Sequence, residues 1–296
     1  MSDLKLYGIE DIEIQKIGIE EMPRMALFYF PSAKCSDEGE LYVDFSNGEK
    51  VSLEKYPGIL ANFIESNREQ LSSRNIIFPE RAPGTVGEES LGPLYTLLKN
   101  LLKDSEKKMY YPGEFQKLSL SKPTDFICSH GVETENGIYS RIKSLVTKQY
   151  CDKMFPTAPE REIPVLQGDN FKLMNLHENQ IALMFGQDAA ALLEPKLEGY
   201  MPGEEFIGNT TRGLELKEKI RNANAIGIVN QMDVPEYQVN IFQERIKKLV
   251  LRANNEFNKP AFWLDAPNYH GHAMVIDNDK VVARLEGPEE GIIFIN

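Results

Sequence analysis

The sequence has 296 residues, of which 42% are hydrophobic and 26% charged, a composition typical of globular domains. Its formal net charge of -12 disfavours a nucleic-acid partner, and no apolar run approaches the roughly 18 residues of a membrane span. The acidic N-terminus MSDLKLYGIEDIEI lacks the basic and apolar regions of a signal peptide, so we expect a cytoplasmic protein without a membrane span.

The first part of the chain predicts a strand, a hairpin and two helices. The run RMALFYFP indicates a buried strand that ends at Pro31, and ELYVDFSNGEKVSL indicates a hairpin whose Asn47-Gly48 turn tolerates positive φ. PGILANFIESNREQL predicts a helix that starts near Pro57. A second helix is indicated by leucines at three- and four-residue spacing, which are Leu94, Leu97, Leu98, Leu101 and Leu102.

A polar, turn-rich stretch between about 104 and 122 predicts a domain boundary, since a chain of this length corresponds to about two domains. Beyond it the apolar runs TDFICS, FKLMNL, AIGIV and PAFWLD alternate with amphipathic segments, which favours an α/β fold. One of these segments places Phe242, Ile246, Leu249, Val250, Ala253 and Phe257 on one helix face. We predict a smaller α+β region over 1–121 and a Rossmann-like α/β domain with a mostly parallel sheet over 122–296.

Polar side chains follow each apolar run of the C-terminal part. Ligands of parallel sheets bind at the carboxyl ends of the strands, so these residues predict a shared cleft. They are Cys128, Ser129 and His130, then His177, Glu178 and Asn179, then Asn230 and Asp233, and finally Asp265, Asn268 and His270. Each of them has an alternative interpretation as a turn former or a helix cap.

The segment NLHENQIALMFGQD resembles the motif of glycosyltransferases of the GT-D fold, where a strand ends in an Arg-Phe-Gly-Asp-Gly-Glu-like sequence before an apolar helix and a glycine. LKEKIRNANAIGIVN is similar to the segment of that fold in which a short helix leads through an Ala-Asp or Ala-Asn pair into a strand. The matches cover about residues 163 to 230. They imply a nucleotide sugar and an unidentified acceptor as small-molecule partners.

In that family an acidic pair holds a divalent metal and the donor diphosphate, so the resemblance implies Mn2+ or Mg2+ with Glu178 as the metal ligand. The residues it assigns to cofactor and donor binding are Asn175, Glu178, Asn179 and Asn230. The catalytic candidates are His177, Asp265 and His270, with His270 contacting the substrate.

The pattern also departs from that family. Asn175 replaces the arginine, and one carboxylate stands where the family has two, which indicates a metal-poor, altered or inactive member. The alternative is that HENQ caps a helix that begins at IALMF.

Two further function classes stay open. The first is a cysteine hydrolase or transferase that pairs Cys128 or Cys151 with His272, although neither thiol stands at the helix N-terminus that would lower its pKa. The second is a non-catalytic protein that binds a protein partner. The three cysteines, of which Cys35 is the other, are widely spaced and form no CxxC pair, so reduced thiols are predicted.

Overall fold

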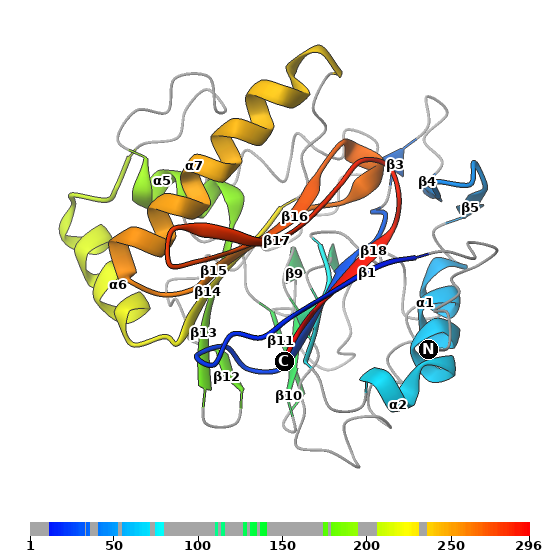
Figure 1. Cartoon of the computed structure of the whole chain (residues 1–296), viewed down its shortest axis with the longest axis horizontal. Coiled ribbons are helices and arrows are strands. Elements are labelled where there is room, and N and C mark those ends of the chain that lie inside the picture. Colours follow the sequence, from blue (N-terminus) through cyan, green and yellow to red (C-terminus); the bar gives the residue numbers. More distant parts are fainter. Residues whose placement is uncertain are drawn as a thin grey trace.

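The structure is a computed structural model, and it describes residues 12–32, 34–35, 41–52, 55–71, 75–79, 110–111, 114–115, 127–128, 131–134, 137–140, 174–176, 179–194, 206–230 and 236–296. Two β-sheets pack face to face, and helices cover both outer faces. Figure 1 shows α5, α6 and α7 on one side of the sheets and α1 and α2 on the other. The α/β class predicted from the sequence is therefore confirmed.

The first sheet has seven strands in the order β1-β18-β2-β6-β7-β10-β11. The strands are β1 (Glu13–Ile17), β2 (Met25–Tyr29), β6 (Asn75–Ile77), β7 (Tyr110–Tyr111), β10 (Gly131–Thr134), β11 (Gly137–Ser140) and β18 (Gly291–Ile295). The last of these, β18, pairs parallel with β1 and antiparallel with β2. This sheet therefore joins early and late segments of the chain.

The second sheet has six strands in the order β12-β13-β14-β15-β16-β17. They are β12 (Met174–Leu176), β13 (Asn179–Phe185), β14 (Ala225–Val229), β15 (Ala261–Leu264), β16 (His272–Asp277) and β17 (Lys280–Glu286). β13, β14 and β15 pair parallel, whereas β12, β16 and β17 pair antiparallel with their neighbours. The expected Rossmann-like parallel sheet is a mixed sheet instead, because connections as short as the turn between β16 and β17 join only antiparallel strands.

Two small sheets and the helices complete the described structure. β3 (Lys34–Cys35), β4 (Leu41–Asp44) and β5 (Lys50–Ser52) form one small sheet, and β8 (Glu114–Phe115) and β9 (Ile127–Cys128) form the other. The helices are α1 (Tyr56–Ser66), α2 (Arg68–Leu71), α5 (Gly186–Leu193), α6 (Thr211–Arg221) and α7 (Val239–Phe257), with 3-10 turns η1 (Glu236–Gln238) and η2 (Pro267–Tyr269). Within the described part, no helix has the length and apolar character needed to cross a membrane.

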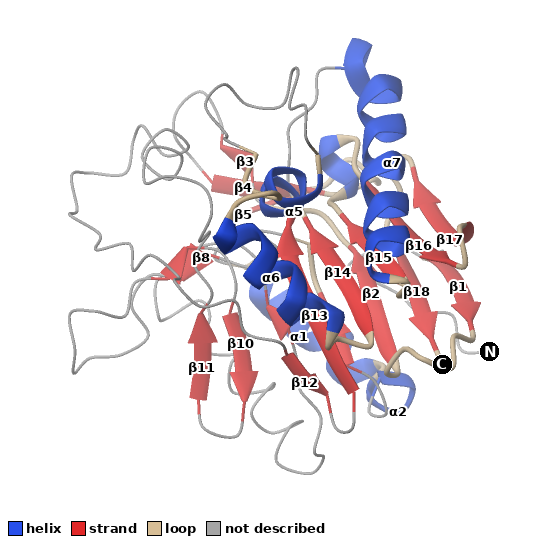
Figure 2. Cartoon of the chain, turned by 90° about the vertical axis from the view of Figure 1, so that its left-hand side faces the viewer, coloured by secondary structure: helices blue, strands red, loops and turns tan. Residues whose placement is uncertain are grey.

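Alternation along the strands builds two cores around the second sheet. Ile228 and Trp263 belong to the core shared with α5 and α7, whereas Val229 and Leu264 belong to the core between the two sheets. Figure 2 shows α5, α6 and α7 lying over the strands of the second sheet. On the far side of the first sheet, aromatic side chains of β2 and α1 pack together, with Phe28 and Phe63 ring centroids 5.8 Å apart.

Several local predictions are confirmed. The Asn47-Gly48 turn joins β4 to β5 with Gly48 at φ 84°, and α1 has a proline in its first turn. All six residues predicted for the apolar face of α7 are buried. The Thr210 side chain caps α6 by accepting a hydrogen bond of 3.1 Å from the Gly213 backbone amide.

The prediction of a helix that begins at IALMF is wrong, because this segment forms β13 and helix α5 begins only at Gly186. The strand is buried on both faces, with Ala182 facing the helices and Leu183 facing the first sheet. A short apolar run of this kind has no amphipathic period that separates a strand from a helix. The segment before it is the β12–β13 hairpin, in which Leu176 pairs with Asn179.

The remaining sequence predictions concern the boundary and the leucine-rich helix. Strands from both sides of the boundary predicted at 121 pair in the first sheet, namely β7 with β10 and both β1 and β2 with β18. The division into two domains stays a prediction. The helix predicted over Leu94 to Leu102 lies outside the described residues.

Candidate functional site

The candidate site lies at the carboxyl ends of β13, β14 and β15, which run parallel and end at one edge of the second sheet. The residues that directly follow these strands are Gly186, Asn230 and Asp265, and we call them the strand-end edge. Residues two positions earlier in each strand belong to the helix-side core. Strand alternation therefore puts the strand-end edge on the helix-facing side of the sheet.

Asn230 and Asp265 are joined by a buried hydrogen bond. The Asn230 Nδ2 group donates to Asp265 Oδ2 over 3.1 Å, and the exposed fractions of the two residues are 3% and 0%. Asp265 Oδ1 accepts a second bond of 2.8 Å from the Ala266 backbone amide. The structure thus brings together two of the residues that the sequence predicted for a shared cleft, and their role as a site stays a prediction.

Gly186 stands where β13 passes directly into α5, and its lack of a side chain is required by its neighbours. A Cβ atom at this position would lie 2.6 Å from Asn230 Oδ1 and 2.8 Å from Trp263 Cη2. Contacts this short force a buried neighbour to move. The space in which a residue 186 side chain would stand is therefore filled by Asn230 and by the Trp263 ring.

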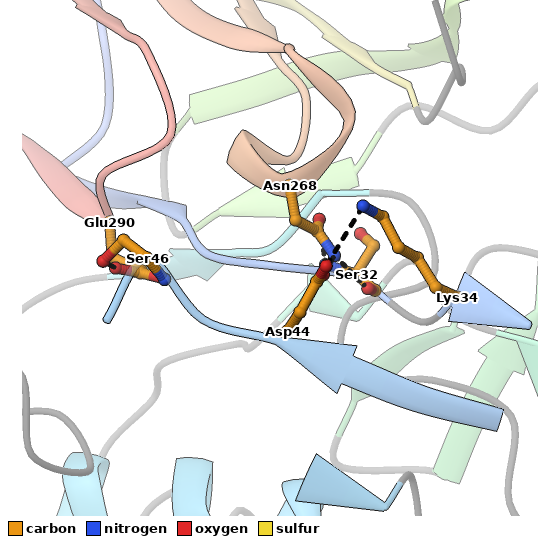
Figure 3. Close-up of polar contacts among 6 residues, drawn as sticks. All are labelled: Ser32, Lys34, Asp44, Ser46, Asn268 and Glu290. Carbon is orange, nitrogen blue, oxygen red and sulfur yellow. Dashed lines mark hydrogen bonds and ion pairs between the residues drawn. The ribbon is translucent and has the colours of Figure 1, made fainter. Parts of the chain in front are cut away.

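A second polar group links η2 to the end of β2 and to β4. The Asn268 side chain accepts a bond of 3.0 Å from the Ser32 amide and donates bonds of 2.7 Å to the Ser32 carbonyl and 2.8 Å to Asp44 Oδ1. Lys34 Nζ lies 3.2 Å from Asp44 Oδ2. Figure 3 shows these four side chains converging from separate elements.

Glu290, just before β18, makes a similar link to the β4–β5 turn. One carboxylate oxygen accepts a bond of 2.9 Å from the Ser46 amide, and the other is hydrogen bonded to the Ser46 hydroxyl (Figure 3). Burial raises the pKa of Glu290, and the hydrogen bonds from Ser46 act in the opposite direction. We call Ser32, Asp44, Ser46, Asn268 and Glu290 the inter-sheet clasp.

The clasp and the strand-end edge approach each other through the segment between β15 and β16. Asp265 and Asn268 both belong to that segment. The Tyr29 hydroxyl of β2 reaches the same segment, with the Gly271 carbonyl 2.5 Å away. Burial first, and then the charge of Asp265, raise the pKa of Tyr29, so this hydroxyl is a neutral donor.

The two late histidines have opposite environments. His270 is exposed and adopts the left-handed conformation, with φ 55°, at the end of η2. His272 lies on β16 and is fully buried, and neither of its ring nitrogens has a hydrogen-bond partner. Burial, and secondly the charge of Arg284, lower the pKa of His272 to about 3, so its ring is neutral at pH 7.

The other sequence-predicted site residues are only partly described. Asn175 lies on β12 and Asn179 on β13, and His177 and Glu178 lie outside the described residues. The catalytic roles predicted for His177, Asp265 and His270 and the metal role of Glu178 stay predictions. Among the residues that the structure describes, no cluster of three or more His, Cys, Asp or Glu side chains could hold a metal ion.

Sequence reasoning missed three residues that shape this part of the molecule. Gly186 could have been noticed as a glycine directly after an apolar run, because such positions often mark a close approach of side chains. Trp263 is the single tryptophan and lies within a predicted strand, but nothing in the sequence tells which groups its indole meets. Glu290 carries no signal, since acidic residues before a strand are usually exposed.

No family model matches the sequence, and no curated protein matches it either. Solved structures do match in fold. An amidase from Nesterenkonia sp. superposes with a TM-score of 0.53 at 12% identity, over 91% of this chain and 88% of that chain. Nit3 of Saccharomyces cerevisiae, a member of branch 10 of the nitrilase superfamily, gives a TM-score of 0.53 at 12% identity, over 93% and 91% of the two chains.

A carbon-nitrogen hydrolase from Helicobacter pylori G27 matches with a TM-score of 0.51 at 11% identity, over 92% of this chain and 89% of that chain. The four-layer architecture is thus that of nitrilase-superfamily structures. The glycosyltransferase resemblance is wrong, and the nucleotide sugar expected from it has no support. The segment NLHENQIALMFGQD resembled the glycosyltransferase motif through its apolar residues. In this structure those residues form the β12–β13 hairpin, whose second strand lies inside the sheet, and IALMF does not form the expected helix.

Proposed function

We propose that this protein binds a small acyl compound, such as an amide, a carboxylic acid or an ester, at the strand-end edge, and that binding there proceeds without a covalent step at the β13–α5 junction. The fold supports the acyl class, because it is shared with an amidase and a carbon-nitrogen hydrolase. The observation that carries the non-covalent part of the proposal is Gly186.

A nucleophilic thiol or hydroxyl works best at a sharp strand-to-helix junction, where the helix dipole lowers its pKa. In the described part of the second sheet, β13 passes without a connecting loop into α5, and Gly186 occupies that junction. Asn230 and Trp263 fill the space that a side chain there would need. The junction therefore has neither a nucleophile nor room for one.

The Asn230 and Asp265 pair supplies polar atoms at the same edge. A carboxamide and a carboxylate held 3.1 Å apart in buried surroundings can orient a polar ligand group, because hydrogen bonds are stronger in a low dielectric. The backbone of the neighbouring residues Gly186 and Ala266 also lies close to this pair of side chains. This combination suits binding and orientation of a small polar group.

A second candidate is a cysteine hydrolase acting on a carbon-nitrogen bond, with Cys128 or Cys151 as the nucleophile. The fold shared with the amidase favours it. Cys128 ends β9, its side chain is not described, and Cys151 lies outside the described residues. The pKa of His272, lowered to about 3, counts against this residue as the base, since a base that weak removes little proton from a thiol.

One assay separates the two candidates. The full chain is incubated with acetamide, propionamide and benzamide, and thermal shift, ammonia release and intact mass are measured together. The first candidate predicts a thermal shift that is lost in Asn230→Ala, with no ammonia and no covalent adduct. Gly58→Ala serves as the matched control, because a Cβ at Gly58 meets open space. Ammonia release that disappears in Cys128→Ser or Cys151→Ser would establish the second candidate and overturn the first.

A further inference from the structure

The edge of the second sheet at β17 is in contact with a side chain of the first sheet. β17 is the last strand in the order of the second sheet, and β1 is the first strand in the order of the other sheet. Figure 2 shows both strands on the same side of the molecule, and Gln15 of β1 contacts Arg284 of β17. Among the described strands, none pairs with the outer side of β17. An edge strand of seven residues can pair with another chain through its backbone.

The register of β16 and β17 shows which backbone groups of β17 point outward. The Asp265 backbone amide donates to the His272 carbonyl over 3.2 Å, so His272 directs its backbone groups towards β15. His272 pairs with Glu286, and Met274 pairs with Arg284. Hydrogen-bonded and non-hydrogen-bonded pairs alternate in an antiparallel ladder, so neither of these two pairs exchanges backbone hydrogen bonds. The backbone N–H and C=O groups of Arg284 and Glu286 therefore point away from the sheet.

The carboxamide group of Gln15 pairs with the outward groups of Arg284 as a neighbouring strand would. Gln15 Oε1 accepts a bond of 3.0 Å from the Arg284 backbone amide, and Gln15 Nε2 donates a bond of 2.6 Å to the Arg284 carbonyl. The same Nε2 group donates over 2.8 Å to Glu13 Oε1. Only this orientation of the carboxamide matches an acceptor to the N–H and a donor to each oxygen. The Gln15 side chain therefore occupies both outward backbone groups of Arg284.

The rest of β17 has features that favour pairing with another chain. Val281 and Val282 are 39% and 40% exposed, and they are two of the exposed large apolar side chains of the described chain. A long edge strand with apolar side chains at the surface is a common site of association between proteins. Occupation of its backbone groups is one way to prevent such association.

The sequence of β17 is complementary to a second copy of itself. If two copies pair antiparallel about Leu285, Arg284 of each copy lies opposite Glu286 of the other, as two-fold symmetry requires. Arg284 and Glu286 share one face of the strand, and their side chains form an ion pair of 2.6 Å within the chain. Opposite charges directly across two strands stabilise their pairing. Because both residues direct their backbone groups outward, each of the two pairs would exchange both backbone hydrogen bonds.

We propose that the Gln15 side chain prevents this protein from associating with a second copy of itself through β17. It does so by occupying the backbone groups of Arg284 that antiparallel pairing about Leu285 requires. Without the carboxamide of Gln15, these groups lose their partner, and a second copy can supply the missing hydrogen bonds. The inference is independent of the proposed function, because no residue of the strand-end edge takes part in it.

The test compares the molecular mass of Gln15→Ala with that of the wild type by sedimentation equilibrium at increasing protein concentration. We expect the mass of Gln15→Ala to rise to double the wild-type value. Gln243→Ala, the same substitution on α7, is the matched control and should keep the wild-type mass. Adding Glu286→Lys to Gln15→Ala puts a lysine opposite Arg284 of the second copy, so the mass should return to the wild-type value. Glu286→Lys alone should leave the mass unchanged.

Two further measurements cover the case in which Gln15→Ala does not fold. Gln15→Glu keeps the length of the side chain but has no donor for the Arg284 carbonyl, so it should associate in the same way. In the wild type, the amides of Arg284 and Glu286 both point outward, and Gln15 bonds that of Arg284. We expect the Arg284 amide to exchange its hydrogen at least about tenfold more slowly than the Glu286 amide.

Three results would overturn the inference. If folded Gln15→Ala and Gln15→Glu keep the wild-type mass at every concentration, Gln15 does not prevent association. If Gln15→Ala associates but Glu286→Lys fails to reverse this, the two copies do not pair through β17 about Leu285. If the Arg284 amide exchanges as fast as the Glu286 amide, the Gln15 side chain does not keep the edge closed.

Discussion

The inter-sheet clasp and the group formed by Trp263, His272 and Arg284, here called the nitrogen cluster, both consist of polar side chains near strand ends, but they differ in how their atoms are paired. In the clasp, Asn268 makes three hydrogen bonds to Ser32 and Asp44, and both oxygens of Glu290 are bonded to Ser46. In the nitrogen cluster, four nitrogens have no partner. Paired polar groups fix the arrangement of helices and strands. Unpaired buried polar groups lower the stability of the fold and remain available to form hydrogen bonds.

The largest effect is expected from breaking the clasp. Asn268→Ala removes three hydrogen bonds, two to the Ser32 backbone and one to Asp44, so the free energy of unfolding should fall by about 3 kcal/mol. Urea denaturation measures this change. Asn255→Ala, on the exposed face of α7, is the matched control and should stay within about 0.5 kcal/mol of the wild type. If Asn268→Ala lowers the free energy of unfolding by less than about 1 kcal/mol, water molecules have replaced the hydrogen bonds of the Asn268 side chain.

The next effect concerns acid and the nitrogen cluster. His272 is neutral when folded, and its pKa of about 3 lies below the ordinary value of 6.5, so the unfolded chain takes up a proton first as pH falls. The contribution of His272 is complete above pH 6.5, and stability is lost as pH falls towards 3. The loss is about 1.4 kcal/mol per pH unit, or about 2.7 kcal/mol between pH 6.5 and 4.5. Urea denaturation at both pH values should show this loss in the wild type and a smaller one, by that amount, in His272→Leu.

A substitution at Gly186 should have an effect of intermediate size on stability, and it tests whether the β13–α5 junction has room for a side chain. Gly186→Ala places a Cβ 2.6 Å from Asn230 Oδ1 and 2.8 Å from Trp263 Cη2, and overpacking of this kind costs about 1–3 kcal/mol. The same change at Gly58, inside α1 with open space around it, should stabilise the protein by about 0.5–1 kcal/mol. Opposite signs in thermal unfolding are expected. A stabilised Gly186→Ala variant would show that the junction can accept a side chain.

The smallest effect belongs to Glu290 and has the sign opposite to that of His272. The raised pKa of Glu290 means that the folded chain holds this proton more tightly, so stability is lost as pH rises from 4.5 through the raised pKa. Glu290→Gln can keep both contacts with Ser46 without the charge and should be up to about 1 kcal/mol more stable at pH 7. The difference should vanish near pH 4. Glu20→Gln, at an exposed position, should show neither trend.

The sequence predicted the local elements well where the residues carry their own signal. The Asn47-Gly48 turn, the proline near the start of α1 and the apolar face of α7 depend on neighbours in the chain, and all three are confirmed. The segment IALMF was assigned to a helix because burial on both faces removes the period that distinguishes strands. Its identity as β13 depends on β14 and the first sheet, which are distant in sequence.

The candidate site was predicted in part for the same reason. That Asn230 and Asp265 lie together could be predicted because parallel strands bring their carboxyl ends together, a rule that needs only the order of elements, whereas their role stays a prediction. The packing around Gly186 and the unpaired nitrogens of His272 depend on register and side-chain contacts, which composition and spacing do not encode. The glycosyltransferase resemblance failed because short apolar patterns recur in unrelated folds.

The position of β18 has a consequence for biosynthesis. This strand lies between β1 and β2, so two early strands must wait for their common neighbour until the ribosome has made residues 291–295. Until then β1 and β2 present unpaired backbone edges, which invite association with other nascent chains. The first sheet can therefore close only after residues 291–295 have left the ribosome.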